Sequence, residues 1–453
     1  MGKKPPSHSK MKRLMKIGGL TSRVSSSYLG QRVVGAFQNE DTRKKGLRRL
    51  HLENAERMAD TMGALKGAAM KLGQSIAVVA DGMDVPPEVG RILGKLHASA
   101  ESIPFSVIRD EIEHNLEGKI DDLFSRFDTE PLGTASLAQA HAAWLPNGTP
   151  VVVKVLHRGI EASVDTDIAA LRSVFVTGRV LRRDPRELNA ILDEIKDRLN
   201  EELDYYKEAA NLEYFADAMS HLDGVQIPRS YPAYCTDRVL TMDRVHGESL
   251  DKFLETATPE ARKRAGDLLI LIFHEMLYGL RALHADPHGG NYLFQRDGSV
   301  GLIDFGCVKR YDLYYVANYA RLAQAMIRSD RGMVNEFSRS LGILVGSDDL
   351  EADDVLWELA DVIAGPFRTD NYTCGGPNDD ILDRVRRVAP KLLLRKEIQS
   401  PSELVYLHRV LAGIYAMLRK LEHQAELGRE LRKYTNLVID EAEGRSNKLR
   451  LGV

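Results

Sequence analysis

Two kinds of hydrophobic spacing follow each other along the chain. Residues 151–155 are a β-branched run after the turn-like segment 146–150, which predicts a hairpin that carries Lys154 into a sheet. From residue 192 onward the apolar positions repeat at helical spacing. This pattern predicts one long helix that carries three carboxylates, Glu202, Asp204 and Glu208.

A lysine inside a sheet needs a reason, so we expect one of the three carboxylates to pair with Lys154. The alternative for the lysine is an edge position that guards against aggregation. The alternative for the carboxylates is a solvated helix face.

The later part of the chain has mainly helical patterns. Residues 268–273 form its most apolar run, which His274 ends, and this predicts a buried core helix. A second, amphipathic helix is predicted from the spacing of Leu404, Leu407, Val410, Leu411 and Ile414. Together the patterns predict an α+β fold with a smaller mixed lobe and a mainly helical larger lobe.

Two motifs in the second half carry chemistry. Asp286 precedes Asn291 by five positions and precedes Asp304, the first residue of Asp-Phe-Gly, by eighteen. This spacing matches a protein-kinase-like catalytic loop and metal-binding strand. Asp304 and Asn291 would then hold magnesium and Asp286 would face the incoming nucleophile, with Lys154 against the nucleotide phosphates. An isolated Asp-Phe-Gly could be a strand-end turn, but this order of motifs favours catalysis.

Three histidines lie close to these motifs. His284 and His288 flank Asp286, and metal ligation or acid–base chemistry is one interpretation of them. We favour a structural interpretation, because no third ligand type recurs at metal-site spacing. The same interpretation applies to His141.

The motifs together resemble the UbiB, or AarF-domain, family of atypical kinases, and the resemblance covers most of the chain. Residues 71–74 match the family's Lys-x-Gly-Gln motif, and residues 131–141 resemble its alanine-rich loop. Residues 202–204 match its Glu-x-Asp motif, and Glu208 falls where the family has its lysine-pairing glutamate.

The resemblance implies a protein-kinase-like bilobal fold with an added N-terminal helical extension. In relatives the extension lies across the cleft and inhibits protein-kinase activity, so Lys71, Gly73 and Gln74 would be regulatory here. Lys71 would meet Glu202 or Asp204. The family is thought to act instead as ATPases or small-molecule kinases that support isoprenoid-quinone, ubiquinone-type, or related lipid metabolism at membranes.

The nucleotide would be ATP or ADP, with Mg²⁺. The resemblance places its phosphates against residues 133–136, and the order of the motifs puts its adenine at the hinge backbone of Met242 and Val245. The family's usual Ala-Ala-Ala-Ser loop reads Gly133, Thr134, Ala135 and Ser136 here. Because alanine restricts positive-φ conformations, we expect Gly133 to restore one flexible position. The preference between ATP and ADP stays open.

Composition adds limits on compartment and partners. The chain has 453 residues, 43% of them hydrophobic, and a net charge of −3, so no general attraction to nucleic acid is expected. Its three cysteines lie far apart, which suits a reducing compartment. Residues 1–50 are rich in lysine and arginine, which predicts contact with anionic lipid headgroups or, alternatively, a solvated tail. With no apolar stretch of spanning length, we expect a cytoplasmic protein in peripheral contact with a membrane.

We therefore predict four parts: a basic arm (1–50), a family-specific helical extension (51–128), a small lobe (129–245) and a helical large lobe (246–453). The leading hypothesis is a magnesium-dependent atypical kinase or ATPase acting near lipid or phenolic quinone precursors. A second is a true kinase for proteins or small molecules. A third is a nucleotide-gated scaffold that binds lipids or biosynthetic enzymes.

Overall fold

The computed structural model describes residues 102–135, 137–160, 202–346 and 349–445, with isolated residues between 19 and 60 and between 164 and 200. Lys71, Gly73, Gln74 and Ser136 lie outside the described residues. The chain divides into two compact units. Unit 1 contains Met1–Ala209 and Ser230–Arg244, and unit 2 contains Ala210–Arg229 and Val245–Val453.

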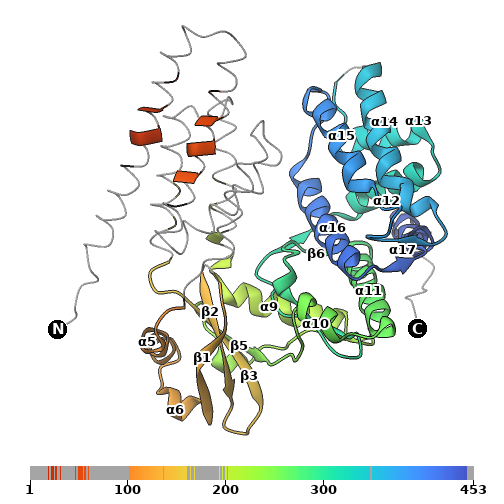
Figure 1. The fold of residues 1–453 in the computed structure, drawn as a ribbon. Helices are drawn as coiled ribbons and strands as arrows, with labels where there is room; N and C mark the ends of the chain where they lie inside the picture. Colours follow the sequence, from red (N-terminus) through yellow and green to blue (C-terminus); the bar gives the residue numbers. More distant parts are fainter. Residues whose placement is uncertain are drawn as a thin grey trace. The chain divides into compact units, whose positions relative to one another are not determined.

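Unit 1 is built on a four-stranded antiparallel sheet in the order β1-β2-β3-β5 (Figure 1). Val151, Val153 and Val155 are fully buried on one face of β3, as the β-branched run predicts, and β2 pairs with β3 as a hairpin. The strand predicted around Lys154 is therefore confirmed. The strands are β1 (Arg126–Thr134), β2 (Ala138–Trp144), β3 (Pro150–Leu156) and β5 (Val239–Asp243).

Two helices cover the buried face of this sheet. Helices α5 (Phe105–Asn115) and α6 (Ile120–Leu123) contribute Ile108, Ile112 and Ile120 to a core shared with the valines of β3. A short 3-10 turn, Pro232–Tyr234, precedes β5. This packing fixes the sheet, and with it the strand that carries Lys154.

The helix predicted from residue 192 is not continuous, which corrects the prediction of one long helix. Glu202 is helical, but Leu203 and Asp204 leave the helix and α9 (Tyr205–Ala218) begins afresh. The Asp204 carboxylate accepts hydrogen bonds from the backbone N–H groups of Tyr206 and Lys207, at 3.1 and 3.2 Å. Aspartate caps a helix N-terminus well, and this local bond outweighs the helical spacing.

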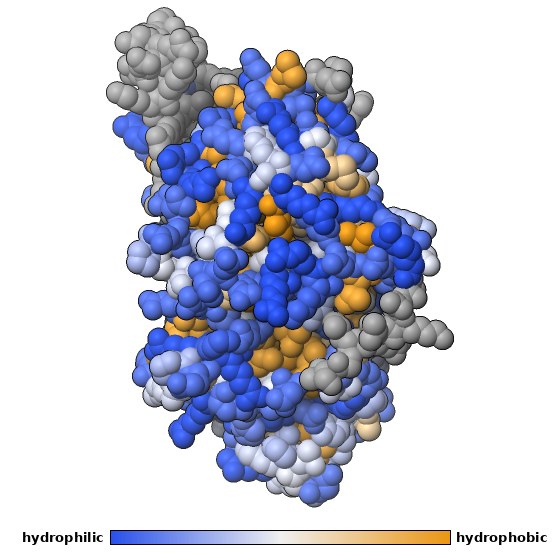
Figure 2. Space-filling view, turned by 90° about the vertical axis from the view of Figure 1, so that its right-hand side faces the viewer, coloured by the Kyte–Doolittle hydropathy of each residue, from blue (hydrophilic) through white to orange (hydrophobic). Residues whose placement is uncertain are grey.

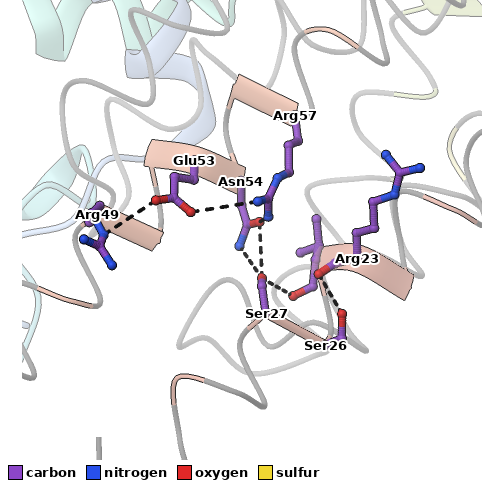
Figure 3. Close-up of polar contacts among 8 residues, drawn as sticks. Arg23, Ser26, Ser27, Arg49, Glu53, Asn54 and Arg57 are labelled. Atoms are coloured by element: carbon purple, nitrogen blue, oxygen red, sulfur yellow. Dashed lines mark hydrogen bonds and ion pairs between the residues drawn. The ribbon is translucent and has the colours of Figure 1, made fainter. Parts of the chain in front are cut away.

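Some residues in the first sixty also form polar contacts (Figure 3). Ser27 and Asn54 exchange hydrogen bonds, and Arg57 donates to Asn54 at 3.0 Å. Glu53 lies within ion-pair distance of Arg49 and Arg57. These contacts join residues from both sides of the predicted boundary at residue 50, although the boundary itself stays a prediction.

Unit 2 contains short strands and most of the helices. Strands β4 (Val225–Gln226), β8 (Val300–Leu302) and β7 (Tyr292–Phe294) form one sheet, in that order. Two further pairs are β6 (Ala282–His284) with β9 (Val308–Arg310), and β10 (Tyr372–Thr373) with β11 (Gln424–Ala425). One catalytic motif lies between β6 and β7 along the chain, and the other lies between β8 and β9.

The helical part of unit 2 confirms both predicted helices. Residues 268–273 lie in α11, where five of the six side chains are buried, and the amphipathic pattern near residue 407 forms α16 (Figure 1). A π-helical turn, Glu275–Gly279, follows α11, and 3-10 turns cover Gly289–Asn291 and Gly365–Arg368. The helices are α10 (Leu250–Thr256), α11 (Pro259–His274), α12 (Leu313–Ile327), α13 (Arg331–Ser340), α14 (Leu350–Ala364), α15 (Ile381–Leu393), α16 (Ser402–Lys420) and α17 (Leu427–Ala442).

The observed class is α+β, with an antiparallel sheet first and helices after it, as predicted. Figure 2 shows a mostly hydrophilic face, on which hydrophobic residues gather only in small groups. Within the described parts of the chain, no helix combines the length and apolar character that crossing a bilayer requires.

Candidate active site

In unit 1, Lys154 forms a buried ion pair. Its Nζ lies 2.6 Å from Oε1 of Glu208, and the two side chains are 13% and 4% exposed. Strand β3 presents the lysine beside Ala140 and Leu240 of its neighbour strands, and Glu208 stands in the first turn of α9. Of the three carboxylates that the sequence left open, the structure therefore pairs Glu208 with the lysine.

The predicted phosphate loop is the turn between β1 and β2. Gly133 and Thr134 end β1, and the N–H of Ala135 donates to the carbonyl of Ala138 at 2.8 Å. Gly133 is not among the glycines with positive φ, and an added Cβ would meet no atom within 4 Å. The flexibility expected of Gly133 is thus not used in this conformation.

The two hinge residues have different surroundings. Met242 is buried within β5, where it pairs with Val152 of β3 and forms a bridge with Ser230. Val245 begins unit 2, where its side chain lies against Gly301 of β8. The chain passes between units at this point.

In unit 2, two antiparallel strand pairs bring the catalytic motifs together. Pairing of β7 with β8 sets Tyr292 opposite Leu302, and the N–H of Ile303 donates to the carbonyl of Asn291 at 3.1 Å. Asp304 is the residue after Ile303, so its backbone lies close to Asn291. Pairing of β6 with β9, extended by a bond from Ala285 N–H to the Cys307 carbonyl at 2.9 Å, holds the chain just before Asp286 against the chain just after Gly306.

Side-chain bonds then order the loop. The amide Nδ2 of Asn291 donates to the backbone carbonyl of Asp286 at 3.0 Å and to its Oδ2 at 3.4 Å. Asp304 Oδ1 accepts from the N–H of Gly306 at 3.1 Å. Because the Nδ2 atom of Asn291 donates hydrogen bonds within the loop, its amide oxygen is the atom that can bind a cation.

Aromatic side chains pack against Phe305 of the Asp-Phe-Gly turn. Phe305 is fully buried, with its ring 4.8 Å from that of Phe215 in α9 and 5.4 Å from the ring of His284. Asn211 Nδ2 donates to the Phe305 carbonyl at 3.0 Å. These contacts hold the backbone directly after Asp304.

The histidines near the motifs have structural contacts. His288 Nδ1 accepts from the N–H of Gly290 at 3.1 Å, and buried His284 packs edge-on against Phe305. His141 is buried in β2, with its two ring nitrogens 2.9 Å from Gln139 Nε2 and from the Asp128 carbonyl, and burial lowers its pKa. These contacts agree with the structural interpretation of all three.

The Asp286 carboxylate affects the pKa of a neighbouring tyrosine, Tyr292. Burial raises the pKa of the Tyr292 hydroxyl, and the negative charge of Asp286 raises it further. Tyr292 therefore stays protonated and neutral beside the carboxylate.

One partner of Asp286 was missed by sequence reasoning. Arg409 of α16 places Nη2 3.0 Å from Asp286 Oδ1. One helical turn later, Gly413 faces the next loop residue, because a Cβ built on it would lie 2.4 Å from Cβ of Pro287. Arg409 lies 123 positions from Asp286 along the chain, so no local spacing links the two residues.

Asp304 and Asn291 present the kinds of oxygen atom that magnesium prefers. Carboxylate and amide oxygens suit Mg²⁺, which binds one or two protein groups together with phosphate oxygens and water. Asn291 directly precedes β7 and Asp304 closely follows β8, so these two paired strands place the two oxygen types near each other. Elsewhere in the described chain, as here, no three His, Cys, Asp or Glu side chains gather as a site that could hold a metal by themselves.

Comparison with known proteins identifies the family. The ABC1 atypical kinase-like domain matches residues 95–338, which is more than half of the chain. The chain belongs to this family. The resemblance to the UbiB and AarF-domain atypical kinases is thereby confirmed, and the matched region includes Lys154, Asp286 and Asp304.

Members of the ABC1 family from several organisms align with most of the chain. "Atypical kinase COQ8, mitochondrial" of Saccharomyces cerevisiae is 26% identical over 431 residues, covering 94% of this chain and 85% of that protein. "Atypical kinase coq-8, mitochondrial" of Caenorhabditis elegans is 27% identical over 417 residues, 91% of this chain and 54% of that protein. "AarF domain-containing protein kinase 1" of Xenopus laevis is 30% identical over 301 residues, 65% and 57% respectively. The chain thus spans only about half the length of the nematode and frog relatives.

A solved structure shares the fold. The protein in "The complex structure of Rv3197-erythromycin from Mycobacterium tuberculosis" superposes with a TM-score of 0.58 over 82% of this chain and 93% of its own, at 23% identity. At this identity the similarity concerns the fold alone.

Proposed function

We propose that this member of the ABC1 family is a magnesium-dependent atypical kinase or ATPase that serves isoprenoid-quinone or related lipid metabolism at a membrane surface. The observation that carries the phosphoryl-transfer half is the meeting of Asp286, Asn291 and Asp304 at the ends of two strand pairs. The lipid half rests on the family resemblance and on the basic residues before position 50.

Each site residue has a role in this proposal. Asp304 and the amide oxygen of Asn291 hold magnesium, and Asp286 orients the incoming hydroxyl or water. Lys154, held by Glu208, contacts the α- and β-phosphates of ATP or ADP, which also meet the backbone of residues 133–136. Backbone groups of Met242 and Val245 contact adenine. Bound magnesium would neutralise phosphate charge as the terminal phosphoryl group is transferred.

The regulatory part of the proposal concerns Lys71, Gly73 and Gln74. In the family pattern Lys71 engages Glu202 or Asp204 and so restricts access to protein substrates. Asp204 already accepts two backbone hydrogen bonds. Both bonds are accepted by Oδ1, so Oδ2 of Asp204 could still accept an ammonium proton, and the choice between Glu202 and Asp204 stays open.

Magnesium-dependent nucleotide binding and phosphate release test the first half of the proposal. Asp304→Asn removes a formal ligand charge and should abolish the magnesium-dependent part of ATP binding, measured by calorimetry, together with phosphate release. Asp370→Asn is the matched control, since Asp370 is exposed and lies in a bend outside the site. Equal binding and release by wild type and Asp304→Asn would overturn the role of Asp304.

The lipid half has its own measurement. Phosphate release should rise when anionic liposomes and a phenolic quinone-precursor mimic are added, and neutral liposomes without the mimic should not raise it. If phosphate release is the same with and without both additions, the ATPase activity would stand and the assignment to lipid metabolism would be overturned.

A further inference from the structure

We propose that Arg409 is a positioning residue for the phosphoryl transfer, and that α16 is the element that sets the orientation of Asp286. This inference rests on the proposed function, because it assigns a residue to that same reaction. Arg409 does not touch the nucleotide in this proposal. It acts through the carboxylate of Asp286.

The first observation is that Asp286 is held from two sides. Arg409 Nη2 contacts Oδ1 at 3.0 Å, while Asn291 Nδ2 contacts Oδ2 at 3.4 Å and the backbone carbonyl at 3.0 Å. With both oxygens engaged by different elements, rotation of the carboxylate is restricted. Each oxygen keeps a further lone pair that can accept a proton from, or orient, an incoming hydroxyl or water.

The second observation is that α16 approaches the loop with its backbone. A Cβ on Gly413 would lie 2.4 Å from Cβ and 3.0 Å from the carbonyl oxygen of Pro287, the residue after Asp286. Arg409 and Gly413 are four positions apart, so they share one helix face. Leu407, Val410 and Ile414 are buried and anchor the helix in the core of unit 2. The guanidinium therefore extends from a rigid base.

The third observation concerns the contribution of the Arg409–Asp286 ion pair to folding stability. The side chains of Arg409 and Asp286 are 34% and 26% exposed. Ion pairs this accessible to water contribute little to stability. Orientation of the catalytic carboxylate is the effect for which this geometry is suited, since small displacements of a reacting group lower the rate steeply.

Steady-state phosphate release from MgATP tests the inference in the full chain. Arg409→Ala should lower kcat by about tenfold to a hundredfold while the KM for MgATP changes less than about twofold. Arg409→Lys keeps the charge but not the planar fork, and it should fall between wild type and Arg409→Ala. Lys420→Ala is the matched control, because this α16 cation pairs with exposed Asp251 and should leave both constants unchanged.

Two further readouts separate positioning from a merely structural role. Guanidinium ion, added below denaturing concentrations, should restore part of the kcat of Arg409→Ala and none of that of Asp286→Asn. Arg409→Ala should also add no measurable loss to Asp286→Asn, because both changes act on one carboxylate.

The outcomes divide cleanly. Wild-type release that depends on Asp304, with kcat unchanged or raised in Arg409→Ala, would overturn the role of Arg409 and leave the proposed function intact. A loss confined to KM, or a loss without rescue and with a matching fall in thermal stability, would also overturn positioning. Absence of Asp304-dependent release from the wild-type protein would overturn both the proposed function and the role of Arg409 in it.

Discussion

Two ion pairs of this molecule use the same chemistry in different surroundings. Lys154 and Glu208 meet at 2.6 Å with side chains 13% and 4% exposed, whereas Arg409 and Asp286 meet at 3.0 Å with about a third and a quarter of their side chains exposed. The first pair joins a strand to the first turn of α9 within unit 1. The second joins a long helix to the catalytic loop within unit 2.

The difference in burial predicts a difference in purpose. A buried charge that loses its partner is costly, so the first pair is tied to the stability of unit 1 as well as to phosphate binding. A partly exposed pair contributes little stability, so the second can serve orientation without being a structural necessity. Stability and activity measurements should therefore separate the two pairs.

The largest expected effect is on the buried pair. Lys154→Met should lower the free energy of unfolding by about 3 kcal/mol, measured by urea denaturation, because it removes the ion-pair partner of the buried Glu208 carboxylate. The double variant Lys154→Met, Glu208→Gln should recover part of this loss. Lys119→Met is the control, since Lys119 forms a similar 2.7 Å pair with Glu113 but is 75% exposed. If both lysine variants lose the same stability, burial does not distinguish the pairs.

The next effect concerns the close contact between Gly413 of α16 and Pro287 of the catalytic loop. Gly413→Ala would normally stabilise a helix, but here the added methyl group collides with Pro287, and we expect a loss of about 2 kcal/mol together with reduced phosphate release. Gly332→Ala in α13 is the matched control, because the nearest atom to its Cβ lies at 3.5 Å. That change should be neutral or stabilising. Equal behaviour of the two alanines would contradict close packing of α16 on the loop.

Acid should weaken unit 2 through a buried histidine of α11. Burial lowers the pKa of His274 to about 3, while the unfolded chain keeps a value near 6.5. Between these values the unfolded chain binds the additional proton, so the contribution of neutral His274 is complete above about pH 6.5 and is lost as the pH falls toward 3. We expect the free energy of unfolding to fall by about 1 to 2 kcal/mol between pH 7 and pH 5. His274→Phe should remove this part of the pH dependence, and an unchanged slope would contradict the assignment.

The smallest expected effect is the change in stability when the partly exposed pair of Arg409 and Asp286 is broken. Arg409→Gln should change the free energy of unfolding by less than about 1 kcal/mol even though it lowers turnover. Denaturation and phosphate release measured on the same sample would show this separation. A stability loss as large as that of Lys154→Met would remove the contrast between the two pairs.

Local patterns explain what could be predicted from the sequence. The alternation around Lys154 and the spacing of Asp286, Asn291 and Asp304 are short-range signals, and each strand pair in the structure places these residues as the spacing requires. The break before α9 was missed because Asp204 fits a helical repeat and also caps a helix, and only the folded chain selects between these uses.

Long-range contacts explain the rest. Arg409 meets Asp286 only because the buried face of α16 packs in the core of unit 2, and no periodicity of a single helix encodes that neighbour. Gly413 likewise reads as an ordinary helix residue until Pro287 is beside it. Gly133 shows the opposite case, since its residue type predicts a special backbone conformation that the structure does not use.

The most direct test of the account is phosphate release from saturating MgATP by wild type and Asp286→Asn, with nucleotide binding measured on the same samples. We predict that Asp286→Asn retains nucleotide binding and loses release by at least about a hundredfold, because the residue that orients the nucleophile is neutralised while the magnesium ligands remain. Release that persists undiminished in Asp286→Asn would contradict the central claim that this loop carries out the phosphoryl transfer.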